Sequence, residues 1–184
     1  AHVEEAVGVM KIIRSRPGHE IILSNYYQAN LAHFKKWSPL MPRTHHSVAS
    51  WSLRLVEREK EFEEDKSVHF IGTNDSESLL IGTCSISNIV RGVFQSCHIG
   101  YSVDRNFEGR GKMQEIVEHT IGYVFSELKL HRIIANHMPA NTRSEALLKR
   151  LGFEREGYAK RFLQIDGKWE DHVLNSLINK DYRE

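Results

Sequence analysis

Apolar residues in the first third of the chain recur at spacings that change from strand to helix. Met10–Arg14 is a short apolar run typical of an edge strand, and His19–Asn30 predicts a helix. Lys35–Pro42 holds two prolines and predicts a loop. Ser47 is placed to cap a second helix that runs to about Lys66. The helical spacing is carried by Ile21, Ile22, Asn25 and Tyr26 in the first helix and by Trp51, Leu55 and Phe62 in the second.

The middle of the chain predicts three consecutive strands. Val68–Thr73 is followed by a turn at residues 74–76, and Leu79–Val90 leads into a tight connection at Arg91-Gly92. Val93–Val103 completes the series. Strand alternation puts five of its side chains on one face, namely Val93, Cys97, Ile99, Tyr101 and Val103. Three strands in a row predict an antiparallel meander.

The last third of the chain alternates helices and strands. Lys112–Leu128 has the clearest helical pattern in the sequence, and Arg132–Met138 predicts a short strand. Asn141–Leu151 predicts a helix that ends at Gly152. Two final strands, Phe153–Ile165 and Trp169–Leu177, are expected to form a hairpin that turns at Asp166-Gly167.

These elements define a fold class. Their order is strand, two helices, three strands, helix, strand, helix and two strands, and the strand–helix–strand passages near the C-terminus predict some parallel pairing. We therefore expect an α+β protein with a mixed central sheet of about 6–7 strands and about four helices. The expectation is one domain over residues 1–184, with residues 1–9 as a poorly structured leader.

Composition narrows the classes of function. The 184 residues include 25 Lys and Arg against 24 Asp and Glu, and this near-zero charge argues against binding nucleic acid through many phosphate contacts. No apolar run reaches the roughly 18 residues of a membrane span, and the first residues do not form a secretory signal. Cys84 and Cys97 lack CxxC spacing, and the histidines lack metal-ligand spacing. We expect a cytoplasmic protein that binds neither metal nor membrane.

The segment Val103–Met113 carries the clearest chemistry. It joins a strand to the helix with the clearest pattern. Gly109 and Gly111 let the backbone approach a ligand, and the free amides at the helix start favour a phosphate. Arg110 and Lys112 add positive charge. A P-loop requires Ser or Thr after the lysine, and a dinucleotide loop requires a third glycine. Since neither is present, the remaining interpretation is the pyrophosphate loop of an acyl-CoA enzyme.

This segment resembles motif A of the GNAT superfamily of N-acetyltransferases, with Asn106 at a position where the family has Gln or Arg. The superfamily's Asn-x-x-Ser…Leu-Gly-Phe helix is matched by Asn141–Ser144 and Leu151–Phe153. Nearly the whole chain from about Met10 resembles the ribosomal-protein-alanine N-acetyltransferases of the RimJ/RimL type, and most closely RimJ. The segments that carry this similarity are Trp37-Ser38-Pro39, Ile99-Gly100-Tyr101, Gly109–Lys112, His131-Arg132-Ile133 and Asp166–His172.

The resemblance implies an enzyme that transfers acetyl from acetyl-CoA to the N-terminal alanine of a small-subunit ribosomal protein. Ser144 is the candidate acid for the leaving thiolate, because Leu148 occupies the position of the tyrosine that many members use. Trp37 and Asp171 are the expected acceptor contacts. The residues expected to bind acetyl-CoA are Tyr101, Ser102, Val103, Gly109, Arg110, Gly111, Lys112, Met113 and Asn141. Core packing for Tyr101 and Val103, and helix capping for Asn141 and Ser144, remain alternatives.

The base on the acceptor side does not carry over from the family, because Asn136 and Leu163 stand where related enzymes have glutamate. We expect Asn136 to relay the proton through a water, with His137 and Asp171 as fallback bases. An α-amine suits such a weak relay. Roughly 10–20% of it is neutral at pH 7, against about 0.04% of a lysine amine, a difference of roughly 3.4 kcal/mol.

Two other functions stay open. An acetyltransferase of this type can act on a small amine such as a polyamine or an aminoglycoside, and a long anionic groove would favour that function. A non-catalytic module that binds acyl-CoA is the second alternative, and it would show no turnover with any amine. Ser144→Ala would then change nothing.

Overall fold

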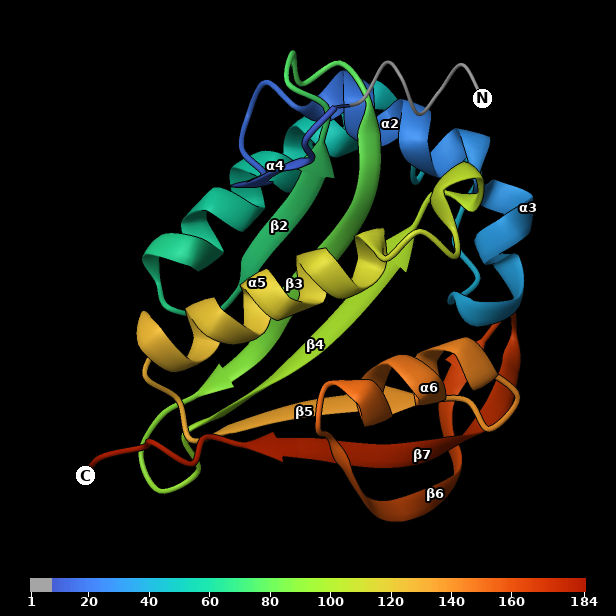
Figure 1. Cartoon of the computed structure of the whole chain (residues 1–184). Helices are drawn as coiled ribbons and strands as arrows, with labels where there is room; N and C mark the ends of the chain where they lie inside the picture. Colours follow the sequence, from blue (N-terminus) through green and yellow to red (C-terminus); the bar gives the residue numbers. More distant parts are fainter. Residues whose placement is uncertain (1–7) are drawn as a thin grey trace.

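The computed structural model describes residues 8–184, which form one seven-stranded mixed sheet in the order β1-β2-β3-β4-β5-β7-β6 (Figure 1). All neighbouring strands are antiparallel except β4 and β5, which are parallel. This confirms the mixed α+β sheet. The strands are β1 (Lys11–Arg14), β2 (Val68–Thr73), β3 (Leu80–Val90), β4 (Ser96–Val103), β5 (Arg132–His137), β6 (Glu154–Ile165) and β7 (Lys168–Ile178). Most of the expected leader, residues 1–7, lies outside the described residues.

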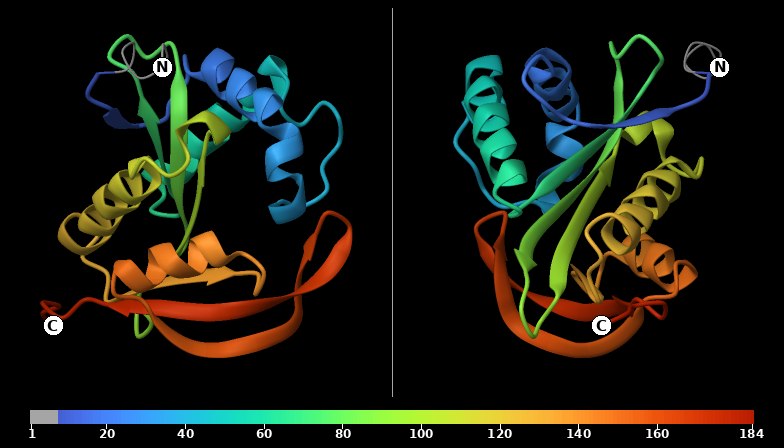
Figure 2. Two further views of the ribbon diagram at one scale, coloured as in Figure 1. Left: turned by 45° about the vertical axis from the view of Figure 1, so that its right-hand side comes forward. Right: turned by 90° about the vertical axis from the view of Figure 1, so that its left-hand side faces the viewer.

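Helices cover both faces of the sheet. One face carries α2 and α4 and the opposite face carries α5 and α6, as the right-hand view of Figure 2 shows. The α-helices are α2 (Glu20–Ala29), α3 (Leu31–Phe34), α4 (Val48–Glu63), α5 (Lys112–Ser126) and α6 (Thr142–Arg150), with 3-10 turns η1 (Lys35–Trp37) and η2 (Arg105–Phe107). Within residues 8–184, no helix combines the length and the apolar character needed to cross a membrane.

Each layer of helices has its own core. On one face Trp51 and Leu55 of α4 pack with Leu23 and Tyr26 of α2, and all four side chains are buried. The Ser47 side chain accepts a hydrogen bond from the Ser50 amide, as predicted for the cap of α4. On the opposite face, α5 and α6 pack on the sheet through Ile116, Val117, Val124, Leu147 and Leu148. Phe62, expected beside Trp51, instead packs at the edge of this second core.

Three sequence predictions need correction. Ile21 in α2 is 60% exposed while Leu23 is buried, so the apolar face of this helix is turned from the predicted one. Val93 lies outside β4 and is fully exposed, because Gly92 and Gln95 adopt positive φ and residues 91–95 form a longer connection. The residues after Asn30, predicted as loop from Lys35, continue as α3 and η1, which raises the helix count to five.

The strands β4 and β5 separate soon after they meet. Their pairing covers only three rungs, from Ser96↔Arg132 to His98↔Ile134, whereas β4 stays paired with β3 as far as Val103. Of the two strand–helix–strand passages expected to give parallel pairing, only the one through α5 does so, because β5 pairs antiparallel with β7. The divergence of β4 from β5 is visible in Figure 1 and positions the site described next.

Candidate active site

A cavity of about 610 Å³ opens where β4 leaves β5. Its floor comes from β3 and from Gly100–Val103 of β4. The cavity reaches both faces of the sheet, since Tyr27 and Trp37 line it from one side and Met113 and Ser144 from the other. Trp37 therefore lies in a cavity wall, where the sequence placed it.

The backbone of β4 offers unpaired polar groups to this cavity. The Asp104 amide donates to the Ile81 carbonyl oxygen at 2.8 Å. Groups on an antiparallel strand point alternately to one side and the other, so the N–H and C=O of Tyr101 and Val103 point away from β3. They face the gap that β5 leaves, and an amide-bearing ligand can pair with them as an added strand does.

A second cavity of about 220 Å³ surrounds the start of α5. Gly111 is the N-cap of this helix, with φ of 74°, and no side chain caps it. The first amides of a helix have no intrahelical partner, and the helix dipole makes this end electropositive. Gly109 has φ of 71°, which a side chain would strain. The loop therefore presents free backbone donors suited to a pyrophosphate.

Three polar side chains that the sequence analysis missed, Glu108, His33 and Arg143, meet at the large cavity. Glu108 forms ion pairs with His33 of α3 and Arg143 of α6, and both Glu108 and Arg143 line both cavities. Burial raises the pKa of the Glu108 carboxyl, but the charges of Arg143 and His33 outweigh burial and bring it below its ordinary value. Among the described residues that line the large cavity, Glu108 is the one carboxylate. Its ion pairs leave it poorly suited to act as a base.

Ser144 meets a tyrosine from the sheet. Its Oγ lies 2.5 Å from the Tyr101 Oη, and its amide donates to Asn141 Oδ1 at 3.2 Å, so Asn141 caps α6. Burial raises the pKa of Tyr101 to about 12, although the hydrogen bond with Ser144 opposes the shift. Tyr101 therefore keeps its hydroxyl proton at neutral pH. Leu148 is buried in the core, as expected of a position without catalytic chemistry.

A row of hydroxyl groups lines the large cavity. It consists of Thr83, Ser85 and Ser87 of β3 and Ser102 of β4. The Ser102 Oγ lies 2.8 Å from Thr83 Oγ1 and 2.7 Å from the Oη of Tyr26. The sequence analysis missed this row. Small hydroxyl residues at every second position of an otherwise apolar strand were the available signal.

The structure gathers most of the predicted residues. The two cavities are lined by Trp37, Tyr101, Ser102, Val103, Gly109, Gly111, Lys112, Met113, Asn141 and Ser144. Arg110 is not among the residues that line either cavity, and its guanidinium lies over the Phe107 ring at 5.8 Å. Within residues 8–184, no group of three or more His, Cys, Asp or Glu side chains is placed to hold a metal.

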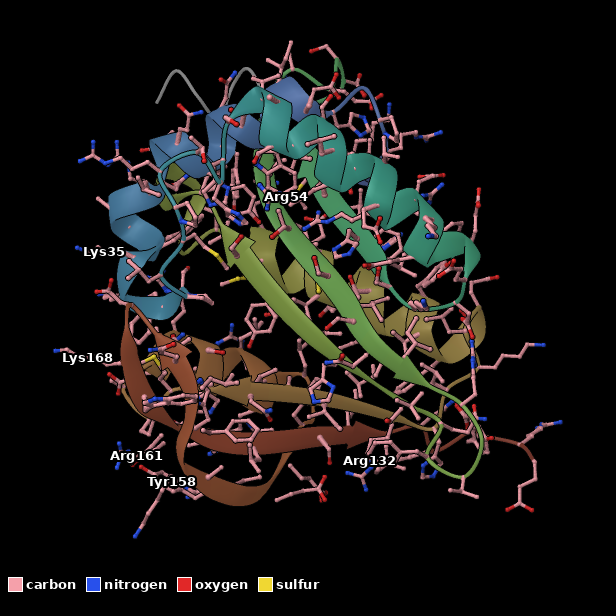
Figure 3. The ribbon with its side chains drawn as sticks, turned by 180° about the vertical axis from the view of Figure 1, so that it is seen from behind. Lys35, Arg54, Arg132, Tyr158, Arg161 and Lys168 are labelled. Atoms are coloured by element: carbon pink, nitrogen blue, oxygen red, sulfur yellow. The ribbon has the colours of Figure 1, made fainter. Side chains whose placement is uncertain are left out.

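The residues proposed for the acceptor-side proton do not line these cavities. Asn136 points its Oδ1 into a buried position without a partner among the described residues, and His137 is buried beside the Met138 carbonyl at 2.8 Å. Asp171 accepts hydrogen bonds from the Tyr158 hydroxyl at 2.6 Å and the Arg161 amide at 2.8 Å. These bonds, the Tyr158 one first, lower the pKa of Asp171. Figure 3 labels Tyr158 and Arg161 on β6, the outer strand of the sheet.

A sheet with this split and an anion-binding helix start defines the class of acyl-CoA-dependent acetyltransferases. The family model of the GNAT acetyltransferase domain matches residues 19–154, and the chain belongs to this family. It is 40% identical to the [Ribosomal protein uS5]-alanine N-acetyltransferase of Escherichia coli K12, over 95% of this chain and 89% of that protein.

Two solved structures agree with this family. The ribosomal-protein-S5-alanine acetyltransferase from Vibrio fischeri is 34% identical, with a TM-score of 0.92 over 95% of this chain and 96% of that one. Mycobacterium smegmatis RimJ in complex with CoA-disulfide is 28% identical, with a TM-score of 0.87 over 97% and 86%. The resemblance to RimJ-type enzymes is confirmed, and so is the single GNAT fold. Members of this family use acetyl-CoA as co-substrate, which fits the free amides of the Gly109–Lys112 loop.

Proposed function

We propose that this acetyltransferase acts on the N-terminal α-amine of a small-subunit ribosomal protein and prefers alanine at that terminus. The observation that carries the proposal is the 40% identity to the uS5-alanine enzyme, which extends over 95% of this chain and 89% of that protein. The similarity thus extends over both the Trp37 segment and the Gly109–Lys112 loop. The partner would be a protein terminus rather than RNA, and a ribosomal acceptor would place the reaction in the cytoplasm.

The geometry supports roles for the residues on the donor side. The α5 amides and Gly109–Lys112 would hold the pyrophosphate, and the free N–H and C=O groups of Tyr101 and Val103 would hold the pantetheine arm. Acetyl-CoA supplies the acetyl group as a thioester, in which the C–S bond breaks as the new C–N bond forms. A backbone amide at the gap, such as that of Val103, would stabilise the negative charge that develops on the carbonyl oxygen.

The leaving sulfur needs a proton, and the Tyr101–Ser144 pair would supply it. One of the two hydroxyl groups donates to the other, so a proton leaving Ser144 can be replaced from Tyr101 across a 2.5 Å contact. The high pKa of Tyr101 keeps that hydroxyl protonated before each transfer. Asn141 fixes the first turn of α6 and hence the place of Ser144.

The acceptor amine must lose a proton. The sequence assigns this step to Asn136 with a bound water. Its unpartnered buried Oδ1 is a place where a water can bind, but Asn136 lines neither cavity, which leaves room for another path. Asp171 and His137 remain the weaker alternatives. The demand on any base is small, since roughly 10–20% of an α-amine is neutral at pH 7.

The decisive experiment incubates the enzyme with acetyl-CoA and unacetylated small-subunit ribosomal proteins, then measures intact masses. We expect one protein to gain one acetyl group, and fragmentation should place it on an N-terminal alanine. Acetylation of polyamines or aminoglycosides but of no ribosomal protein would favour a small-amine enzyme. Binding of acetyl-CoA without turnover on any amine would favour a non-catalytic module. Either result would contradict the proposal.

A further inference from the structure

A chain of hydrogen bonds runs from the surface of α4 to the floor of the active-site cavity. The Ser67 hydroxyl donates to Glu61 Oε2 at 2.7 Å, and Ser67 Oγ lies 3.2 Å from His69 Nε2. On the other side of the imidazole, Nδ1 lies 2.7 Å from Ser85 Oγ. Ser85 lines the large cavity. We propose that Glu61, Ser67, His69 and Ser85 form the path by which the acceptor α-ammonium loses its proton.

The sheet itself sets up this path. His69 of β2 is directly opposite Ser85 of β3, which is in turn directly opposite Gly100 of β4. Residues in register across a sheet share one face, so the three positions form a row on the side of α2 and α4. A Cβ built on Gly100 meets nothing within 4 Å, so the third position leaves open space beside Ser85. An amine at the divergence of β4 can therefore reach the Ser85 hydroxyl.

The Glu61 end of this path of hydrogen bonds sets the donor and the acceptor of every bond in it. The Ser67 hydroxyl donates its single proton to Glu61 Oε2 and has none left to donate to His69. Ser67 then accepts from His69 Nε2–H, and the neutral ring has its lone pair at Nδ1. Ser85 must donate to that lone pair. The Ser85 oxygen consequently turns only lone pairs toward the cavity, where it can accept from an ammonium N–H.

The surroundings keep the imidazole neutral and ready to accept. Burial lowers the pKa of His69 to about 3, and the nearby Arg58 guanidinium lowers it further. Both charged groups that face the ring among the described residues come from α4, namely Arg58 and, through Ser67, Glu61. The hydroxyl groups bonded to the two ring nitrogens, those of Ser85 and Ser67, are neutral.

The transfer balances as a concerted shift of four protons. The ammonium N–H proton moves to Ser85 Oγ, the Ser85 proton to His69 Nδ1, the His69 Nε2 proton to Ser67, and the Ser67 proton to Glu61. The amine keeps its electron pair for attack on the thioester carbonyl, and no charge remains on the ring. Glu61 is half-exposed and releases the proton to water. To restore the starting direction, the ring gives up its Nδ1 proton and takes one at Nε2 while the hydroxyl groups rotate back.

The inference rests on the proposed α-amine acceptor, and one set of assays separates the two. The test measures kcat/KM with a peptide carrying N-terminal alanine for wild type, Ser85→Ala, Ser85→Thr and His69→Gln from pH 6.5 to 9.5. The relay increases the fraction of acceptor that can react only at pH values where the amine is still largely protonated. We therefore expect Ser85→Ala and His69→Gln to lose roughly five- to tenfold at pH 7, from the roughly 10–20% of neutral amine, and to approach wild type above pH 9.

Conservative and matched variants complete the test. Ser85→Thr keeps the hydroxyl and should retain most activity at pH 7. Glu61→Gln should lose less than His69→Gln because water can accept at that exposed end. His119→Gln and Ser126→Ala, at exposed positions of α5, should match wild type. The same loss at every pH, or no loss in Ser85→Ala, would overturn the relay. Absence of any wild-type turnover on α-amines would instead remove the proposed function.

Discussion

Tyr101 and Ser144 join the two halves of the molecule, since one lies on β4 and the other on the first turn of α6, with their hydroxyl oxygens 2.5 Å apart. β4 lies on one side of the gap between β4 and β5, and α6, which follows β5 in the chain, lies on the other side. The contact therefore places a proton donor at the gap, beside the backbone groups that would hold the thioester.

Removing either hydroxyl should slow acetyl transfer. We expect Ser144→Ala to lower kcat by about 100-fold and Tyr101→Phe by less, with little change in KM, because the lost proton acts on the transition state. The double variant should lose about as much as Ser144→Ala alone, since the two groups act as a unit. Steady-state kinetics with acetyl-CoA and an α-amine peptide provides the measurement.

A matched control is available for this pair. Tyr182→Phe removes a phenol hydroxyl near the C-terminal end, where Tyr182 packs on His131, and should leave kcat unchanged. If Ser144→Ala and Tyr101→Phe both keep wild-type kcat, the hydroxyl pair has only a structural role.

Gly100 should control how much room the acceptor has. Its φ is not in the left-handed region and a Cβ meets nothing within 4 Å, so Gly100→Ala should fold with unchanged Tm. The added methyl group enters the cavity and should raise KM for the acceptor peptide several-fold, with a larger increase in Gly100→Val. Gly122→Ala on α5 also meets open space and should leave KM unchanged. Equal KM values for Gly100→Ala and wild type would show that the acceptor does not pass this position.

Substitutions at Asn136 and at Asp171 should affect different properties of the enzyme. Asn136→Ala tests the alternative to the Ser85 path: if Asn136 and a water carry the acceptor proton, kcat at pH 7 falls several-fold because the oxygen that would hold the water is lost. If the Ser85 path carries the proton, Asn136→Ala keeps kcat near that of wild type. Asp171→Asn should instead lower Tm slightly while activity persists, because Asp171 binds the Tyr158 hydroxyl and the Arg161 amide at a register shift of the β6–β7 hairpin. The comparison needs kcat and Tm for both variants. A steep loss of activity in Asp171→Asn with normal Asn136→Ala would reverse these roles.

Acid should destabilise the fold through His69 before the carboxylates protonate. The unfolded histidine titrates near 6.5, whereas in the folded chain burial lowers the pKa of His69 to about 3. The folded state thus keeps His69 neutral while the unfolded state binds a proton, so this stability is present above pH 6.5 and declines as pH falls toward 3. Each such group contributes a slope of about 1.4 kcal/mol per pH unit.

The variant His69→Gln isolates that slope. Burial likewise lowers the pKa of His46 to about 4, so wild type has at least two such groups. Urea unfolding at pH 6, 5 and 4 should show that the free energy of unfolding of His69→Gln falls less steeply with decreasing pH than that of wild type. The difference in slope should correspond to about one proton. Parallel curves for the two proteins would mean that His69 is protonated in the folded state.

The sequence predicted those features that depend on local spacing. The amphipathic pattern of Lys112–Leu128 locates α5, and two glycines with a helix after them locate the loop with free backbone amides. Capping by Ser47 and Asn141 follows from residue type and position. Such features are set by neighbours within a few residues along the chain, and a pattern therefore reveals them.

Other features depend on contacts between distant segments. Arg91 binds Asp65 and the Leu128 carbonyl, which holds residues 91–95 in a longer connection than the Arg91-Gly92 dipeptide suggests. Glu108 meets His33 and Arg143 only because η2, α3 and α6 converge. Ser85 likewise meets His69 of β2, which is linked through Ser67 to Glu61 of α4. No spacing rule links these residues before the fold brings them together.

The short pairing of β4 with β5 has a kinetic consequence. Because the cavity opens on both faces of the sheet, one substrate can arrive past Met113 and Ser144 while the other arrives past Tyr27 and Trp37. Two substrates that enter from opposite faces of the sheet do not block each other's entry. Both can be present at once and react directly, without the protein ever carrying the acetyl group itself. Initial-rate plots at several concentrations of both substrates should then intersect rather than run parallel.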